Sequence, residues 1–160
     1  MKCERTYNSV IILAVIFNPL IWDAISEDGM RQEDFILDVN GSCWLELRSD
    51  AGELVGVYEL KSVNCATLEL HAHVMPELRK EHSRQTGIEV LKWIALNAPS
   101  SYQKLIAKVP DMHENVHKFL RSFKFTEQGK ITESHWKGGK LHDVTIFGLA
   151  RSQIQEAISG

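Results

Sequence analysis

The stretch Leu68–Ile94 reads LELHAHVMPELRKEHSRQTGIEVLKWI and changes its hydrophobic period partway along. Its first part alternates between apolar and polar side chains, which is typical of a β-strand. Pro76 interrupts the alternation, and Ile88, Leu91 and Ile94 then recur at the spacing of an amphipathic helix that begins with the basic run RKEHSR. Because free backbone amides at a helix N-terminus bind anions, the stretch predicts a strand, a turn with an anion site, and a helix.

The other elements follow from periodicity and turn residues. Asn18-Pro19 predicts a helix with Asn18 as its N-cap and Pro19 at its first position. Gly52 and the pair Gly138-Gly139 predict two hairpins. The predicted strands are Tyr7–Phe17, Cys43–Leu47, Leu54–Val63, Ala66–Val74, Tyr102–Val109, Phe125–Thr132 and His142–Leu149. Three helices are predicted: one begins at Pro19, one contains Ile88 and ends near Asn97, and one contains Val116–Phe123.

The run Val10–Phe17, VIILAVIF, has two alternative interpretations, a targeting or membrane segment and a buried strand. It is much shorter than the roughly 20 apolar residues that a spanning helix requires. The preceding residues mix positive and negative charges, and no small-residue cleavage pattern follows. The sequence therefore predicts a fully buried strand and a cytoplasmic protein without a membrane partner.

Length and charge limit the class of protein. The chain has 160 residues and a formal net charge of −3, so we expect one domain spanning residues 1–160 and no general binding to nucleic acid. Its three cysteines show no metal-binding spacing, which is typical of a reduced intracellular protein.

The order of strands and helices is an α+β pattern with parallel crossovers around the helix that follows the fourth strand. This order resembles that of the GNAT superfamily of N-acetyltransferases, whose motif A reads Val-x-Pro and then Arg-Gly-x-Gly-x-Gly. Val74, Pro76 and Arg79 match that motif. The resemblance implies a GNAT-like fold, with a mixed, mostly antiparallel sheet of about seven strands flanked by three or four helices. It also implies that the fourth and fifth strands splay apart around acetyl-CoA as co-substrate.

The three glycine positions of the motif are Lys80, His82 and Arg84 in this chain. Side chains there could crowd the pyrophosphate, whereas their positive charge could attract it, and a third alternative is a basic turn that only caps the helix. The resemblance implies a cofactor site made of His73, Val74, Arg79, Lys80, Glu81, His82, Ser83 and Arg84.

The second half of the chain extends the resemblance. Asn115 lies early in a predicted helix, where the family's Asn contacts the pantetheine arm, so Asn115 joins the cofactor candidates. Phe125 and Gly129 match the family's Gly-Phe-x-x-x-Gly, but Lys124 occupies the position of the first glycine. The segment His142–Arg151 is similar to the closing strand of the family.

Acetyl transfer to an amine requires a base for the ammonium and benefits from an acid for the departing thiolate. Glu69, His71 and His73 alternate onto one strand face, which makes Glu69 and His71 the base candidates. The alternative is that they form the solvent face of an amphipathic strand. Arg121 stands where the family often has a catalytic Tyr, and His117 is the nearest titratable substitute.

Histidine pairs also raise the question of a metal. His113 with His117, and His71 with His73, have spacings that could face one ion. No third ligand is placed by spacing beside either pair, so we expect no metal.

We therefore predict an acetyl-CoA-dependent N-acetyltransferase that acts on a protein lysine, an N-terminus or a small cationic amine. The acidic residues of segment 27–38 would suit a cationic acceptor, although a solvated loop is the better explanation of them. The glycine-poor turn is similar to that of GNAT-like proteins of tailed bacteriophages. An alternative is thus an inactive GNAT-fold structural or host-interaction protein in the host cytoplasm or a virion, with a homodimer or a phage protein as partner. A toxin-like enzyme acting on charged tRNA lacks its expected basic surface.

Overall fold

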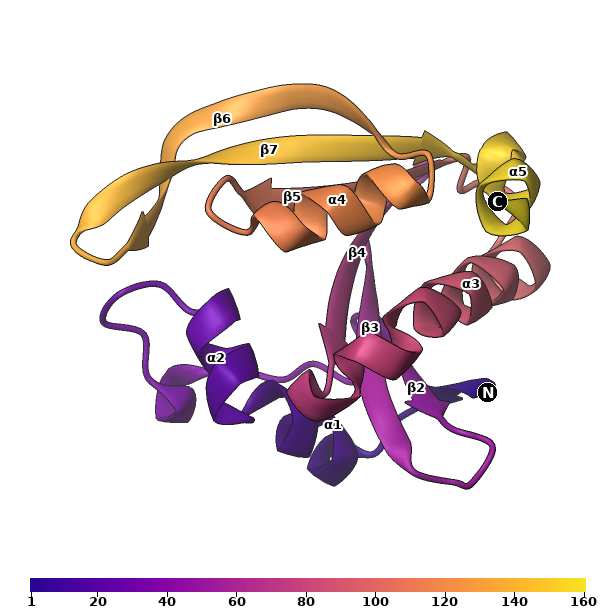
Figure 1. Ribbon diagram of the computed structural model, residues 1–160, viewed down its shortest axis with the longest axis horizontal. Helices are drawn as coiled ribbons and strands as arrows, with labels where there is room; N and C mark the ends of the chain where they lie inside the picture. The colour runs from indigo at the N-terminus through magenta and orange to yellow at the C-terminus, as the bar shows by residue number, and fades with distance from the viewer.

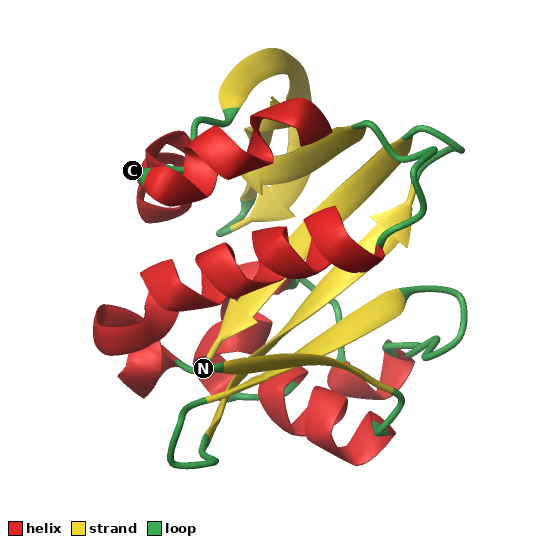
Figure 2. Ribbon diagram, turned by 90° about the vertical axis from the view of Figure 1, so that its right-hand side faces the viewer, coloured by secondary structure: helices red, strands yellow, loops and turns green.

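The computed structural model describes residues 1–160 and contains one sheet flanked by helices (Figures 1 and 2). The strands are β1 (Lys2–Thr6), β2 (Cys43–Arg48), β3 (Leu54–Ser62), β4 (Thr67–Val74), β5 (Lys104–Pro110), β6 (Thr126–Lys137) and β7 (Lys140–Ala150). The helices are α1 (Ser9–Ile16), α2 (Pro19–Ile25), α3 (Arg79–Asn97), α4 (Glu114–Ser122) and α5 (Ile154–Ser159), with short 3₁₀ turns at Gln32–Asp34, Pro76–Leu78 and Arg151–Gln153.

The seven strands are arranged in the order β1-β2-β3-β4-β5-β7-β6. All neighbouring strands are antiparallel except β4 and β5, which are parallel and joined by α3. This confirms the predicted α+β class, with its mixed, mostly antiparallel sheet. The parallel crossovers expected around the helix after the fourth strand reduce to a single one, from β4 through α3 to β5. The helices number five, whereas we expected three or four, because α1 and the short α5 were not predicted as helices.

Two hydrophobic cores cover the two faces of the sheet. The larger core joins β2 to β5 and β7 with α3, α4 and α5, through residues such as Leu91, Leu120 and Ile154. The smaller core packs α1 and α2 against Trp44 and Val57 on the opposite face. No helix is both long and apolar enough to cross a membrane.

The prediction of a central strand at Tyr7–Phe17 is wrong. The segment forms helix α1, whose first amides, those of Val10 and Ile11, donate to the side chain of the N-cap Asn8. The first strand lies upstream, at Lys2–Thr6. An aliphatic run of eight residues has no periodicity that separates a strand from a buried helix, so the cap at Asn8 and packing on the sheet decide the structure.

The predicted caps and hairpins are confirmed. Asn18 caps α2 by accepting from the amide of Leu20, and Pro19 opens the helix. The turn between β6 and β7 contains Gly138 and Gly139, which both adopt positive φ, as predicted for a tight hairpin.

A candidate cofactor cleft between β4 and β5

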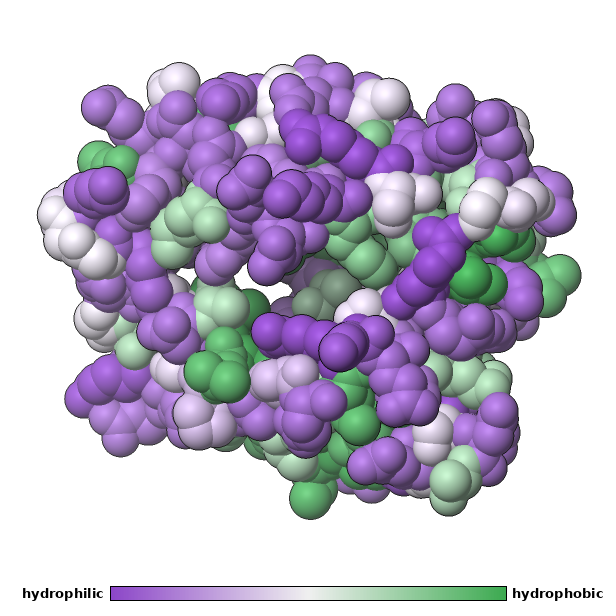
Figure 3. Space-filling model, in the orientation of Figure 1, coloured by the Kyte–Doolittle hydropathy of each residue, from purple (hydrophilic) through white to green (hydrophobic).

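The parallel strands β4 and β5 separate after a short paired region. Thr67–Glu69 pair with Lys104–Ile106, after which β4 continues beside β3 and β5 continues beside β7. The amides on one edge of Leu70–Val74 therefore have no strand partner. Figure 3 shows the surface hollowed between the part that contains α4 and β5 to β7 and the part that contains α1 to α3. Unpaired strand amides beside such a hollow can bind the carbonyl groups of an extended ligand.

The turn after β4 leads into α3 at the mouth of this opening (Figure 1). The Nε atom of Arg79 donates to the carbonyl oxygen of Val74 at 3.1 Å, which leaves both terminal guanidinium nitrogens free. Lys80 and Glu81 are exposed, and Ser83 is half-buried in the first turns of the helix. Two cationic side chains thus stand at a helix N-terminus, where the helix dipole also favours an anion.

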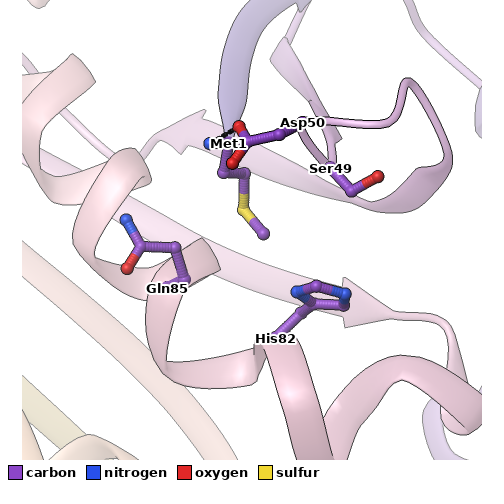
Figure 4. A pocket seen from close by; sticks show the side chains of 5 residues that line it. All are labelled: Met1, Ser49, Asp50, His82 and Gln85. Atoms are coloured by element: carbon purple, nitrogen blue, oxygen red, sulfur yellow. Dashed lines mark hydrogen bonds and ion pairs between the residues drawn. The ribbon is translucent and has the colours of Figure 1, made fainter.

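Two of the predicted cofactor residues point elsewhere. The guanidinium of Arg84 donates to the carbonyl oxygen of Gly160 and stacks over the ring of Phe123, with 5.3 Å between its central carbon and the ring centre. His82 lies 3.7 Å from Glu81 and lines a pocket at the β1–β2–β3 side of α3, shown in Figure 4. The other residues of that pocket are Met1, Ser49, Asp50 and Gln85. In the sheet order, this pocket and the opening between β4 and β5 lie on opposite sides of β3.

Glu69 lies where β4 and β5 separate, because its pair with Ile106 is the last between the strands. Its Oε1 lies 3.5 Å from Nε2 of His71, and its Oε2 lies 3.7 Å from Nζ of Lys108. The register of β4 with β3 is continuous, so Glu69, His71 and His73 share one face, as predicted. The Glu69 side chain is 12% exposed and that of His71 36%, so the pair is accessible without being fully solvated. This arrangement can take up and pass on a proton.

His73 belongs to the core on the α1 side of the sheet. It is 7% exposed, and its ring stacks on Trp44 with 6.5 Å between the ring centres. Its Nδ1 atom is buried and has no hydrogen-bond partner. Burial lowers the pKa of His73 from 6.5 to about 3, with smaller contributions from His71 and Arg79. Its side chain is therefore a neutral core group.

The α4 candidates differ in accessibility. Asn115 is exposed in the first turn of α4. His117 is buried, with Nε2 3.3 Å from the carbonyl oxygen of Pro110 and its ring edge-on to Phe147 at 5.0 Å. His113 uses its Nε2 on the carbonyl oxygen of Ala24 at 3.0 Å, so His113 and His117 do not share one ion. No three His, Cys, Asp or Glu side chains are grouped to hold a metal.

Sequence reasoning missed Lys108, the third member of the Glu69 cluster. Lys104, Ile106 and Lys108 alternate on one face of β5, which is a signal for a partly polar strand face. The parallel register of β4 and β5 decides which β4 residue lies beside Lys108, and this register cannot be predicted from local periodicity.

A family model described as Protein of unknown function (DUF2824) matches residues 23–159. The chain belongs to the DUF2824 family. No curated protein matches this DUF2824 member.

Several solved structures resemble it in fold. The spermidine N-acetyltransferase from Vibrio cholerae in complex with CoA and spermine is 16% identical, with a TM-score of 0.81 over 96% of this chain and 97% of that one. Mutant forms of the spermidine/spermine N-acetyltransferase SpeG from Vibrio cholerae give a TM-score of 0.66 at 18% identity, over 73% of this chain and 71% of theirs. The same enzyme with manganese ions gives 0.65 at 18% identity, over 73% and 69%. At such identities the likeness shows the GNAT fold, which confirms the predicted fold class.

Proposed function

We propose that this DUF2824 member is an acetyl-CoA-dependent N-acetyltransferase, working as one domain over residues 1–160. The observation that carries the proposal is the separation of β4 from β5 directly after the Glu69–Ile106 pair. This separation leaves unpaired amides on the edge of β4, between the cationic N-terminus of α3 and the Glu69–His71 pair. The similar spermidine N-acetyltransferase, with CoA and spermine in its structure, supports this choice of cofactor and acceptor class.

The cofactor would lie along β4. Its pyrophosphate would bind at the start of α3, held by the ammonium of Lys80, the terminal nitrogens of Arg79 and the helix dipole. Val74, Glu81 and Ser83 would contribute through the backbone and the first helical turns. The free amides of β4 would bind the pantetheine arm and the thioester carbonyl, with Asn115 contacting the arm from α4.

In this reaction the acceptor nitrogen loses two protons in all, and a carbon–nitrogen bond replaces the carbon–sulfur bond. The acceptor ammonium would give a proton to Glu69, directly or through His71, and its nitrogen would then attack the thioester carbonyl carbon. The attacking nitrogen loses its second proton as the carbon–sulfur bond breaks, which leaves a neutral amide, and CoA departs as a thiolate that takes up one proton. His117 is the proposed donor of that proton, although its Nε2 faces the carbonyl oxygen of Pro110 in this structure.

Calorimetry with acetyl-CoA and CoA, followed by an assay of thiol release with amine acceptors, tests the proposal. Lys80→Glu should weaken CoA binding at least about tenfold, because it reverses a charge beside two phosphates. Lys92→Glu is the matched control, since it makes the same charge change on the same helix about 18 Å along its axis. Equal CoA affinity in the two variants would show that the pyrophosphate does not bind at the start of α3.

A second candidate function is an inactive GNAT-fold protein with a structural or host-interaction role. The observation that favours it is that Arg84, one of the cations at the glycine positions, is engaged by Gly160 and Phe123. This second proposal includes a bacteriophage origin and a location in the host cytoplasm or a virion. Its partner would be a second copy of the chain or another phage protein. Failure to bind acetyl-CoA at millimolar concentration would favour it over the enzyme.

A further inference from the structure

The tip of the β6–β7 hairpin lies against the segment that follows α2 (Figure 1). We call this contact the clasp and define it as residues 26–28 together with residues 136–139. The two parts are more than 100 positions apart in the sequence, yet several hydrogen bonds join them.

Three hydrogen bonds donated by backbone amides fix the register of the clasp. The amide of Asp28 donates to the carbonyl oxygen of Trp136 at 2.9 Å, and the amide of Trp136 donates to Oε1 of Glu27 at 2.8 Å. The amide of Gly139 donates to Oδ2 of Asp28 at 2.8 Å. Hydrogen bonds from Gly139 and Gly138 hold the pKa of Asp28 below its ordinary value, so its carboxylate is ionised at neutral pH.

Lys137 adds a side-chain connection. Its ammonium donates to the carbonyl oxygen of Ser26 at 2.9 Å and lies 3.3 Å from Oδ1 of Asp23. A second bridge stands beside the clasp, where His113 at the start of α4 contacts the carbonyl oxygen of Ala24 at 3.0 Å. The α2 region is thus connected to both the hairpin and α4.

These connections close a ring around the hollow of Figure 3. One side of the ring is the sheet, where β4 and β5 still pair up to Glu69. The opposite side is the clasp. The helices α1 and α2 cover the part of this sheet face that carries Trp44 and Val57, and Glu69 lies on the same face of β4. The hollow enclosed by the ring is therefore a route by which an amine can reach Glu69.

The clasp also sets the charge at the rim. Within the clasp, Glu27 and Asp28 contribute two carboxylates and Lys137 one ammonium. Two groups stand beside it: Asp23, whose carboxylate pairs with Lys137, and His135, whose Nδ1 lies 4.0 Å from Oε1 of Glu27. The three carboxylates outnumber the lysine ammonium, which leaves a negative rim. A negative rim attracts cations and disfavours neutral or anionic acceptors.

Resting on the proposed function, we infer that the clasp restricts the acceptor to an unbranched aliphatic amine that enters end-on, and excludes lysines on folded proteins. A slender cationic chain can pass an enclosed opening and place its terminal nitrogen beside Glu69. A lysine on a folded surface brings the surrounding backbone against the rim before its nitrogen arrives.

The test compares acceptors across three proteins: wild type, the double variant Asp28→Ala/Lys137→Met, and the control Lys140→Met. Lys140 lies on the same hairpin, is exposed and forms no bond in the clasp. The acceptors are 1,4-diaminobutane, an amine branched beside its nitrogen, and a folded lysine-rich protein. Melting temperatures verify that each variant folds. If the double variant does not fold, the single variant Lys137→Met takes its place in the test.

We expect wild type and the control to prefer 1,4-diaminobutane over the folded protein by at least about 100-fold in kcat/KM. In the opened variant this preference should fall by about tenfold, because the bulky acceptors gain activity. Comparable kcat/KM for the diamine and the folded protein in wild type, or unchanged selectivity in the opened variant, overturns the inference while the enzyme stands. No turnover with any acceptor overturns the proposed function itself.

Discussion

Acidification should destabilise this protein through one buried side chain, His73. The imidazole lies in the core between the sheet and α1, stacked on Trp44, and its Nδ1 atom has no partner. A charged ring there would lose its hydration without gaining a counter-ion, since its charged neighbours are His71 and Arg79. The change that tests this is His73→Phe, which keeps an aromatic ring against Trp44 and removes the titrating group.

The size of the effect follows from the difference in pKa between the folded and the unfolded chain. His73 has a pKa of about 3 when folded and an ordinary value of 6.5 when unfolded. Between these values the unfolded chain binds one proton more, so the free energy of unfolding falls as the pH falls. Each pH unit in that window is worth about 1.4 kcal/mol. From pH 7 to pH 5, wild type should therefore lose about 2 kcal/mol more than His73→Phe.

Urea unfolding of the two proteins at a series of pH values between 7 and 5 measures this difference. Other groups that titrate in this range are common to both chains, so subtracting the two curves isolates His73. Parallel curves would refute the reasoning, because they would mean that the folded protein accommodates a charged imidazole at this position. A wild-type protein that gains stability relative to His73→Phe as the pH falls would show the opposite sign and refute the reasoning as well.

Two further perturbations test the site and the fold. Glu69→Gln should lower kcat by about 100-fold and flatten the acid limb of the pH–rate profile while CoA affinity is kept, and an unchanged profile would exclude Glu69 as the base. Lys124→Gly should raise the free energy of unfolding by up to about 1 kcal/mol, because Lys124 has a φ of 65°, in the left-handed region that favours glycine. Thermal unfolding measures the second effect, and a lower melting temperature would contradict it.

Much of the fold could be predicted because its signals are local. The alternation up to Val74, the break at Pro76 and the helical spacing after it are contained in one short stretch. The pair Asn18-Pro19 is typical of a helix N-terminus, and the pair Gly138-Gly139 is typical of a tight turn with positive φ. Such signals do not depend on what the segment later packs against.

The failure at Val10–Phe17 has a different cause. An aliphatic run is compatible with a buried strand and with a buried helix. Packing against Trp44 and Val57 on the sheet determines that this run is a helix. The N-cap at Asn8 was the one local signal available.

The candidate site was predictable in residue type but not in arrangement. The spacing of Glu69 and His71 places them on one face, but their position where β4 and β5 separate depends on the parallel register. Lys108 and the clasp arise from contacts between distant segments. A basic run such as RKEHSR likewise does not reveal which of its charges are already engaged by other parts of the chain.

The loss of motif glycines affects the two places where it occurs in different ways. At Lys80, His82 and Arg84 the chain is an ordinary right-handed helix, and the only non-glycine residues with positive φ are Lys124 and Glu133. Side chains at the first three positions therefore cost no backbone strain, and their effect on a pyrophosphate depends on the space they occupy. His82 turns toward its pocket and Arg84 toward Gly160, so Lys80 is the one that remains beside the start of α3. An ammonium at that position attracts a pyrophosphate, which favours a remodelled cofactor site over a lost one and makes Lys80→Glu the deciding substitution.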